Sequence, residues 1–123
     1  MQDFRKLNIY IEAMEFCAQI YKFSAQLPPS EKFGLISQMR RAASSIPLNI
    51  AEGAGTASTK EFAQFISYAY RSANEVLTCL ELTQKLELSN EQVLIISLEK
   101  EGRKLSCMIY SFFKSLGGKT YNL

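Results

Sequence analysis

The sequence contains no histidine and no tryptophan among its 123 residues. The absence of histidine removes the commonest general base of enzymes and the commonest nitrogen ligand of zinc. Serine nucleophiles therefore lack an imidazole partner, and a di-iron site built from Glu-x-x-His motifs is excluded. Local carboxylate pairs such as Glu12 with Glu15 have no histidine to complete such a site. We expect no enzymatic activity, no cofactor and no metal.

Cysteine is scarce as well, and Cys17, Cys79 and Cys107 form no Cys-x-x-Cys pair. An odd number without framework spacing indicates reduced thiols, and we expect all three to be buried as small apolar side chains. No apolar run approaches the roughly 20 residues that span a bilayer, and no apolar signal region follows the first charged residues. The pattern predicts a cytoplasmic protein without a membrane span.

Neither sign of charge is in large excess, since 14 basic and 12 acidic residues give a net charge of +2. A dedicated nucleic-acid-binding domain is usually far more basic, so composition alone neither suggests nor excludes nucleic acid. What the chain has in abundance is apolar residues, at 47%. This is ample for a packed core and argues against intrinsic disorder.

The apolar residues recur every three or four positions through four long stretches, which is the period of amphipathic helices. The expected helices span about 7–25, 31–54, 59–87 and 90–116. Because the breaks between them are short, neighbouring helices must run antiparallel. We therefore predict an all-α protein, a single-domain antiparallel up-down-up-down four-helix bundle covering residues 1–123.

Each predicted helix has an expected buried stripe. In the first helix it is Leu7, Ile11, Met14, Ala18, Tyr21 and Ala25. In the second it is Ile36, Met39, Ala43, Ile46, Ile50 and Gly53. In the third it is Phe62, Ile66, Ala69, Ala73, Val76, Leu80 and Thr83. In the fourth it is Ile95, Leu98, Gly102, Leu105, Ile109, Phe112 and Leu116.

The helix ends follow from local chemistry. Pro28-Pro29 should stop the first helix and Ser30 should cap the second, in which Pro47 is expected to cause a kink and not a stop. Capping boxes are expected at Ser58–Glu61 and Ser89–Gln92. C-terminal caps are expected at two places, Gly53 with Gly55 and Gly117 with Gly118, and residues 119–123 are expected to fray.

Several helices carry more apolar residues than a bundle core needs. The first, third and fourth helices add residues such as Tyr10, Tyr68 and Val93 outside their stripes. Because monomers rarely expose large contiguous apolar patches, the surplus predicts a surface for self-association.

A ridge of polar side chains runs along the second predicted helix, beside its apolar stripe. Its members are Gln38, Arg41, Ser45, Asn49 and Glu52. One interpretation is contact with a phosphate backbone, for which the first candidates are Arg40, Arg41 and Arg71. The other, favoured by the residues alone, is a set of hydrogen bonds between helices that fixes their register.

The end of the fourth helix is biased toward positive charge by five residues, Lys100, Arg103, Lys104, Lys114 and Lys119. Cations near a helix C-terminus interact favourably with the helix dipole, so a solvated basic face is the simplest interpretation. Contact with nucleic acid or with an acidic protein is the alternative.

The second helix also carries a recognisable sequence. The run is Gln38, Arg40, Arg41, Ala42, Ser45, Ile46, Pro47, Asn49, Ile50, Ala51, Glu52 and Gly53. It resembles the most characteristic segment of the 23S ribosomal RNA intervening-sequence protein family, also called four helix bundle protein. Flanking similarities include Leu27-Pro28 upstream and Glu61-Phe62 downstream. Thr56 differs from the arginine that is usual in the family.

The resemblance implies an antiparallel four-helix bundle that assembles into a homopentamer in bacteria. It implies no established biochemical activity and no catalytic residues. A similar fold serves as the accessory protein of diversity-generating retroelements, where it engages reverse transcriptase and nucleic acid. We therefore expect a non-enzymatic oligomer that contacts RNA or an RNA-bound protein; the alternative is a purely structural oligomer that binds no nucleic acid.

Overall fold

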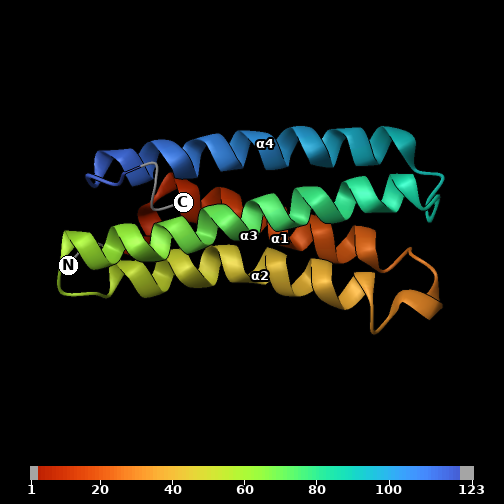
Figure 1. The fold of residues 1–123 in the computed structure, drawn as a ribbon, viewed down its shortest axis with the longest axis horizontal. Helices are drawn as coiled ribbons and strands as arrows, with labels where there is room; N and C mark the ends of the chain where they lie inside the picture. Colours follow the sequence, from red (N-terminus) through yellow and green to blue (C-terminus); the bar gives the residue numbers. More distant parts are fainter. Residues whose placement is uncertain (1–2, 120–123) are drawn as a thin grey trace.

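The computed structural model describes residues 3–119. Its four long helices are α1 (Asn8–Ser24), α2 (Leu35–Ala54), α3 (Thr59–Lys85) and α4 (Gln92–Ser115). Two 3₁₀ turns, η1 (Phe4–Lys6) and η2 (Pro29–Glu31), precede α1 and α2. The helices lie side by side and successive helices run in opposite directions (Figure 1). The predicted all-α up-down-up-down bundle is confirmed.

The bundle closes because α1 packs against α4 as well as against α2. The contact between α2 and α3 is the most extensive of the helix pairs, and that between α1 and α4 is the least extensive of the four adjacent pairs. Side chains from all four helices form one core, in which Phe23, Met39, Leu80 and Phe113 are among the largest fully buried members.

The expected stripes of α2, α3 and α4 are confirmed for most of their members. All six stripe residues of α2 are buried. In α3 only Phe62 is half-buried, and in α4 Phe112 and Leu116 are half-buried while Phe113 takes the core position.

The stripe expected for the first helix is wrong except for Leu7, which is buried just before α1 begins. Ile11, Met14 and Tyr21 are 52%, 49% and 42% exposed. The buried residues of α1 form a different stripe with the same spacing: Ile9, Ala13, Phe16, Ile20 and Phe23. Because α1 is apolar around most of its circumference, both stripes fit a helical period and only tertiary packing selects between them.

The helix starts differ from the expectation in two of three cases. The capping box of α3 is present, because the Ser58 hydroxyl accepts a hydrogen bond from the Glu61 amide at 3.1 Å. α4 begins at Gln92 without a side-chain cap. α2 begins at Leu35, not at residue 31, and its first amide donates to the Glu31 carboxylate at 3.2 Å, so Glu31 replaces Ser30 as the capping side chain.

Pro47 lies within α2, which continues to Ala54 as predicted. Gly53 is part of this helix and is buried against α3, so the expected role as a C-terminal cap is wrong. Gly117 does end α4: its φ is +84°, and the amide of Gly118 bonds to the Phe113 carbonyl at 3.0 Å.

The cysteines are free, as expected, but only Cys79 is fully buried. Cys17 is half-buried and Cys107 is exposed, so the prediction of three buried thiols is wrong for Cys107. Between residues 3 and 119, no helix combines the length and the apolar character needed to cross a membrane.

Candidate functional site

The polar ridge of α2 faces α3 over much of its length. The Gln38 side chain donates a hydrogen bond to Glu75 at 2.5 Å, and the Ser72 hydroxyl donates to the Ser45 hydroxyl at 2.9 Å. Asn49 donates to both the carbonyl and the hydroxyl of Ser45, at 2.8 and 2.9 Å. The bonds of Gln38 to Glu75 and of Ser72 to Ser45 tie α2 to α3 and fix the register of the two helices, whereas those of Asn49 lie within α2.

Arg40 lies on the opposite side of α2 and binds the C-terminal end of α1. Its Nε donates to the Ser24 hydroxyl at 2.7 Å, and its terminal nitrogen donates to the Tyr21 carbonyl at 3.3 Å. The guanidinium also stacks 4.9 Å from the centroid of the Tyr21 ring. A cation at the last carbonyls of a helix is favourable, so Arg40 joins two helices.

Gln38, Arg41, Glu52 and Arg71 are the exposed members of the predicted site. Within residues 3–119 the side chain of Arg41 makes no hydrogen bond and no ion pair, although its backbone carbonyl accepts a hydrogen bond from the Ser44 hydroxyl. Arg71 lies 5.9 Å from the centroid of the Tyr68 ring. The structure thus separates the three arginines: Arg40 is held between α1 and α2, while Arg41 and Arg71 extend from the outer surfaces of α2 and α3.

The outer side of α1 and α2 forms what we call the α1/α2 apolar face, made of Ile11, Met14, Tyr21 and Leu48. Leu48 is 65% exposed and borders a groove of about 450 Å³. The groove is lined by Phe4, Tyr10, Met14, Cys17, Ser44, Pro47, Leu48 and Ala51. α2 carries no charged residue between Ala42 and Ala51, so its part of this surface is both apolar and uncharged.

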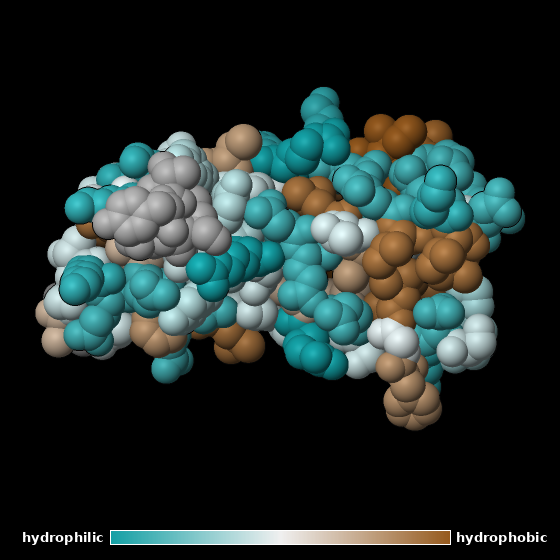
Figure 2. Space-filling view, viewed as in Figure 1, coloured by the Kyte–Doolittle hydropathy of each residue, from teal (hydrophilic) through white to brown (hydrophobic). Residues whose placement is uncertain are grey.

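Other apolar side chains are exposed at the end of the bundle where α3 connects to α4. Leu82, Leu86, Val93 and Ile96 all lie there and are at least 42% exposed. Figure 2 shows hydrophobic surface gathered toward this end, whereas the opposite end is mostly hydrophilic on the face in view.

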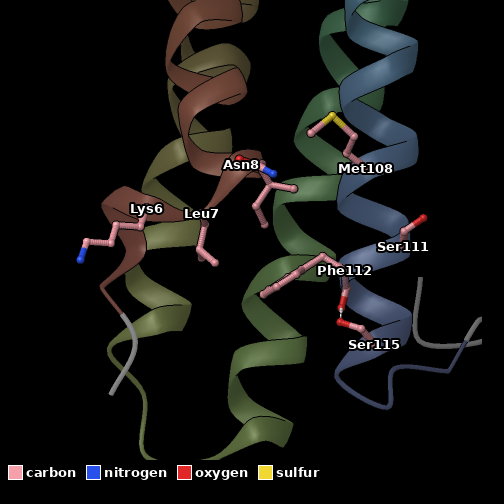
Figure 3. A pocket seen from close by; sticks show the side chains of 8 residues that line it. Lys6, Leu7, Asn8, Met108, Ser111, Phe112 and Ser115 are labelled. Carbon is pink, nitrogen blue, oxygen red and sulfur yellow. Dashed lines mark hydrogen bonds between the residues drawn. The ribbon is translucent and has the colours of Figure 1, made fainter.

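A larger groove, of about 560 Å³, opens between the start of α1 and the end of α4. Figure 3 shows Leu7 and Phe112 extending into it, while Lys6 points away. The Ser115 hydroxyl donates to the Phe112 carbonyl at 2.6 Å and is thereby occupied. The lining contains no carboxylate and no thiol, so it offers no acid–base pair and no activated nucleophile.

A smaller pocket, of about 330 Å³, lies between α3 and α4 and is lined by Tyr70, Ser106, Cys107, Tyr110 and Ser111. We call it the tyrosine pocket. The rings of Tyr70 and Tyr110 are 5.7 Å apart between centroids. Sequence reasoning noted the cations of α4 but missed this pair, although Tyr110 is one helical turn before Lys114.

The carboxylates and the thiols are side chains that could bind a metal or act as a nucleophile. No group of three or more cysteine, aspartate or glutamate side chains among residues 3–119 is arranged to hold a metal ion. Burial raises the pKa of the Cys17 thiol, and burial together with the negative charge of Glu75 raises the pKa of Cys79 to about 11. Both shifts keep these thiols protonated and unreactive at neutral pH.

A family model for the 23S rRNA-intervening sequence protein matches residues 5–111. The chain belongs to this family. The same residues include all of α1, α2 and α3 and most of α4, so the match covers the whole bundle and not only the α2 segment.

A solved structure has the same fold. It is a protein of unknown function from the S23 ribosomal protein family of Bacteroides thetaiotaomicron, with a TM-score of 0.78 and 24% sequence identity. The alignment covers 86% of this chain and 98% of that one. No curated protein matches the chain.

Proposed function

We propose that this member of the 23S rRNA-intervening sequence family is a cytoplasmic, non-catalytic homo-oligomeric scaffold that contacts RNA or an RNA-bound protein. The observation that carries the proposal is the α1/α2 apolar face, where Ile11, Met14 and Leu48 are about half or more exposed and the α2 part carries no charge. Surfaces of this kind mark interfaces, because contact with a partner removes their apolar area from water.

A second copy of the chain is the partner that fits this face best. The uncharged α2 part of this face has no charge pattern that would select a different protein. Two identical copies of it can pack together without electrostatic repulsion. The family resemblance implies a homopentamer, so the expected particle has five times the chain mass of 13.9 kDa.

Contact with RNA is supported by the family to which the chain belongs and by the arginines that remain exposed. The guanidinium of Arg41 has no hydrogen-bond or ion-pair partner within residues 3–119 and is therefore available to a phosphate. Arg40 is a weaker candidate, because its guanidinium already binds Ser24 and Tyr21.

The alternative is a structural oligomer that binds no nucleic acid. It is favoured by the bonds of the α2 ridge, in which Gln38 and Ser45 contact α3. On this account the characteristic segment of the family maintains the bundle and contacts no ligand.

An electrophoretic shift assay with a structured RNA hairpin separates the two functions. Arg41→Ala and Arg71→Ala each remove a cation that would contact a phosphate, so each should weaken RNA binding. Each should also lower the slope of log affinity against log salt concentration by about one. Lys22→Ala, an exposed cation on α1, is the control. Oligomer mass is measured on the same samples. If wild-type protein of unchanged mass shifts no RNA, the structural alternative holds.

A further inference from the structure

The tyrosine pocket lies outside the segment that characterises the family. Tyr70 of α3 and Tyr110 of α4 meet at its centre, and both are half-buried, so part of each ring is accessible. Tyr110 is held in place on its other side by Phe113, with 6.4 Å between ring centroids. The pocket therefore presents rigid aromatic surface at a hollow between two helices.

Hydroxyl groups line the pocket beside the rings. Ser106 donates to the side-chain oxygen of Asn74 at 3.3 Å, which fixes one wall. Ser111 is exposed at the rim. Aromatic faces flanked by small hydroxyl groups suit a planar heterocycle with polar edges, such as a nucleobase.

The charges around the pocket are of one sign. From Gly102 to Lys119 the chain has four cations, Arg103, Lys104, Lys114 and Lys119, and no acidic residue. On α3, the stretch from Phe62 to Asn74 contains Arg71 and no acidic residue. A phosphate chain crossing this surface would meet attraction on both helices.

Two of these cations bracket the pocket along α4. Arg103 precedes Cys107 by one helical turn and Lys114 follows Tyr110 by one turn, and both are exposed. They are 11 positions apart, or about 16 Å along the helix axis. The order along the surface is thus cation, aromatic hollow, cation.

We infer that the tyrosine pocket binds an unpaired base of single-stranded RNA, stacked on Tyr110 or Tyr70, with the flanking phosphates on Arg103 and Lys114. This inference rests on the proposed function and narrows it to a class of RNA. Bases inside a duplex are stacked on one another and cannot enter such a hollow, whereas unpaired bases stack on aromatic side chains without strong sequence preference.

The test compares an oligouridine of about 12 nucleotides with an RNA hairpin, using fluorescence anisotropy on the intact oligomer. Tyr110→Leu removes the ring and should lower affinity for the oligouridine roughly fivefold to a hundredfold. Tyr110→Phe keeps the ring and is the matched control, with affinity expected within about twofold of wild type. Thermal melting of each variant checks that the bundle is folded.

A second pair of variants leaves the core untouched. The double variant Arg103→Ala with Lys114→Ala removes two exposed cations. It should lower the slope of log affinity against log salt concentration by about two. Lys22→Ala with Lys32→Ala removes two exposed cations from the other side and should leave it unchanged.

The chain itself supplies an optical signal. It contains six tyrosines and no tryptophan, so its intrinsic fluorescence reports tyrosine alone. Stacking of a base in the pocket should quench this emission in the wild type, and should quench it less in Tyr110→Phe and Tyr110→Leu, each of which lacks one tyrosine of the pocket. Quenching that is the same in Tyr110→Leu and in wild type would place the base elsewhere.

The outcomes are distinct. Preference for the oligouridine, lost in Tyr110→Leu and retained in Tyr110→Phe, supports the inference. Binding of RNA that is unaffected by the pocket variants overturns the inference and leaves the proposed function standing. If the wild type binds neither RNA, both fail.

Discussion

Gly53 and Gly102 lie where their helices approach neighbouring side chains closely. A Cβ atom at Gly53 would lie 2.8 Å from the Cβ of Phe65 and 2.9 Å from the Phe62 ring. At Gly102 the nearest atoms would be a methyl carbon of Leu77 at 2.8 Å and the Phe16 ring at 3.0 Å. These helical glycines therefore serve packing, not chain reversal.

We predict that Gly53→Ala destabilises the protein by up to about 2 kcal/mol. The clash costs about 1–3 kcal/mol and outweighs a gain in helix propensity of about 1 kcal/mol, because the Phe65 Cβ cannot move without its backbone. Gly55→Ala is the control, since its Cβ would meet nothing closer than 3.5 Å. Urea unfolding measures both, and equal midpoints for the two variants would refute the packing role.

Cys79 should make stability depend on alkaline pH. Burial first, and the charge of Glu75 second, raise the pKa of this thiol from 9.0 to about 11 in the folded protein. The unfolded chain releases this proton at lower pH, so the stabilisation is complete below about pH 9 and is lost as pH rises toward 11. The resulting loss of unfolding free energy is at most about 3 kcal/mol.

Comparison with Cys79→Ala isolates this effect from other groups that titrate in the same range. The wild type should lose more unfolding free energy than the variant between pH 9 and pH 11, as followed by urea unfolding at several pH values. Parallel pH profiles for the two proteins would show that the thiol makes no such contribution.

At the scale of the element, α1 shows that sequence periodicity can predict a helix without predicting which of its faces is buried. Ile11 and Ile20 each belong to a stripe with helical spacing, and the two stripes cannot be ranked by spacing alone. The stripes of α2, α3 and α4 were predictable for most of their members, because polar residues occupy more of the remaining surface of these helices than they do in α1. In α1 the choice is made by packing against α2 and α4, which no local pattern contains.

The start of α2 was unpredictable for a related reason. Ser30 follows two prolines and has the chemistry of an N-cap, yet the chain forms a 3₁₀ turn there and the helix begins at Leu35. The Glu31 carboxylate then reaches the first helical amide. Two residues compete for one capping role, and the geometry of the whole turn decides between them.

We predict that Ile20→Ala costs about 2–5 kcal/mol of unfolding free energy. Ile20 is 0% exposed, so its truncation leaves a cavity in the core. Ile96→Ala is the matched control, because Ile96 is 58% exposed and its loss should stay within about 0.5 kcal/mol. Chemical unfolding of both variants measures this, and similar costs for the two would contradict the assignment of the α1 stripe.

The candidate site could be predicted only in part. The spacing of Gln38, Arg41, Ser45, Asn49 and Glu52 showed that they form a ridge, but not which helix would face it. The structure places Gln38 and Ser45 against α3 and turns Arg40 toward α1. RNA contact by Arg41 and Arg71 stays a prediction. The tyrosine pair could not be found, because it joins residues 40 positions apart on two helices.

At the scale of the whole molecule, apolar and basic surfaces lie on different sides of the bundle. The α1/α2 apolar face is on one side, and the cations around the tyrosine pocket belong to α3 and α4. Assembly through the first face would therefore leave the second open to solvent. The arrangement suits a scaffold that associates with itself through one surface and with RNA through another.

The most direct test is the mass of the protein in solution, measured by sedimentation velocity over a range of concentrations. Leu48→Glu places a charge in the α1/α2 apolar face, and Val93→Glu places the same charge at a residue of α4 that is 84% exposed. We predict an oligomer, five times 13.9 kDa, for the wild type and for Val93→Glu, and a folded single chain for Leu48→Glu. A wild type with the mass of one chain at every concentration, or a Leu48→Glu variant with the wild-type mass, would contradict the account.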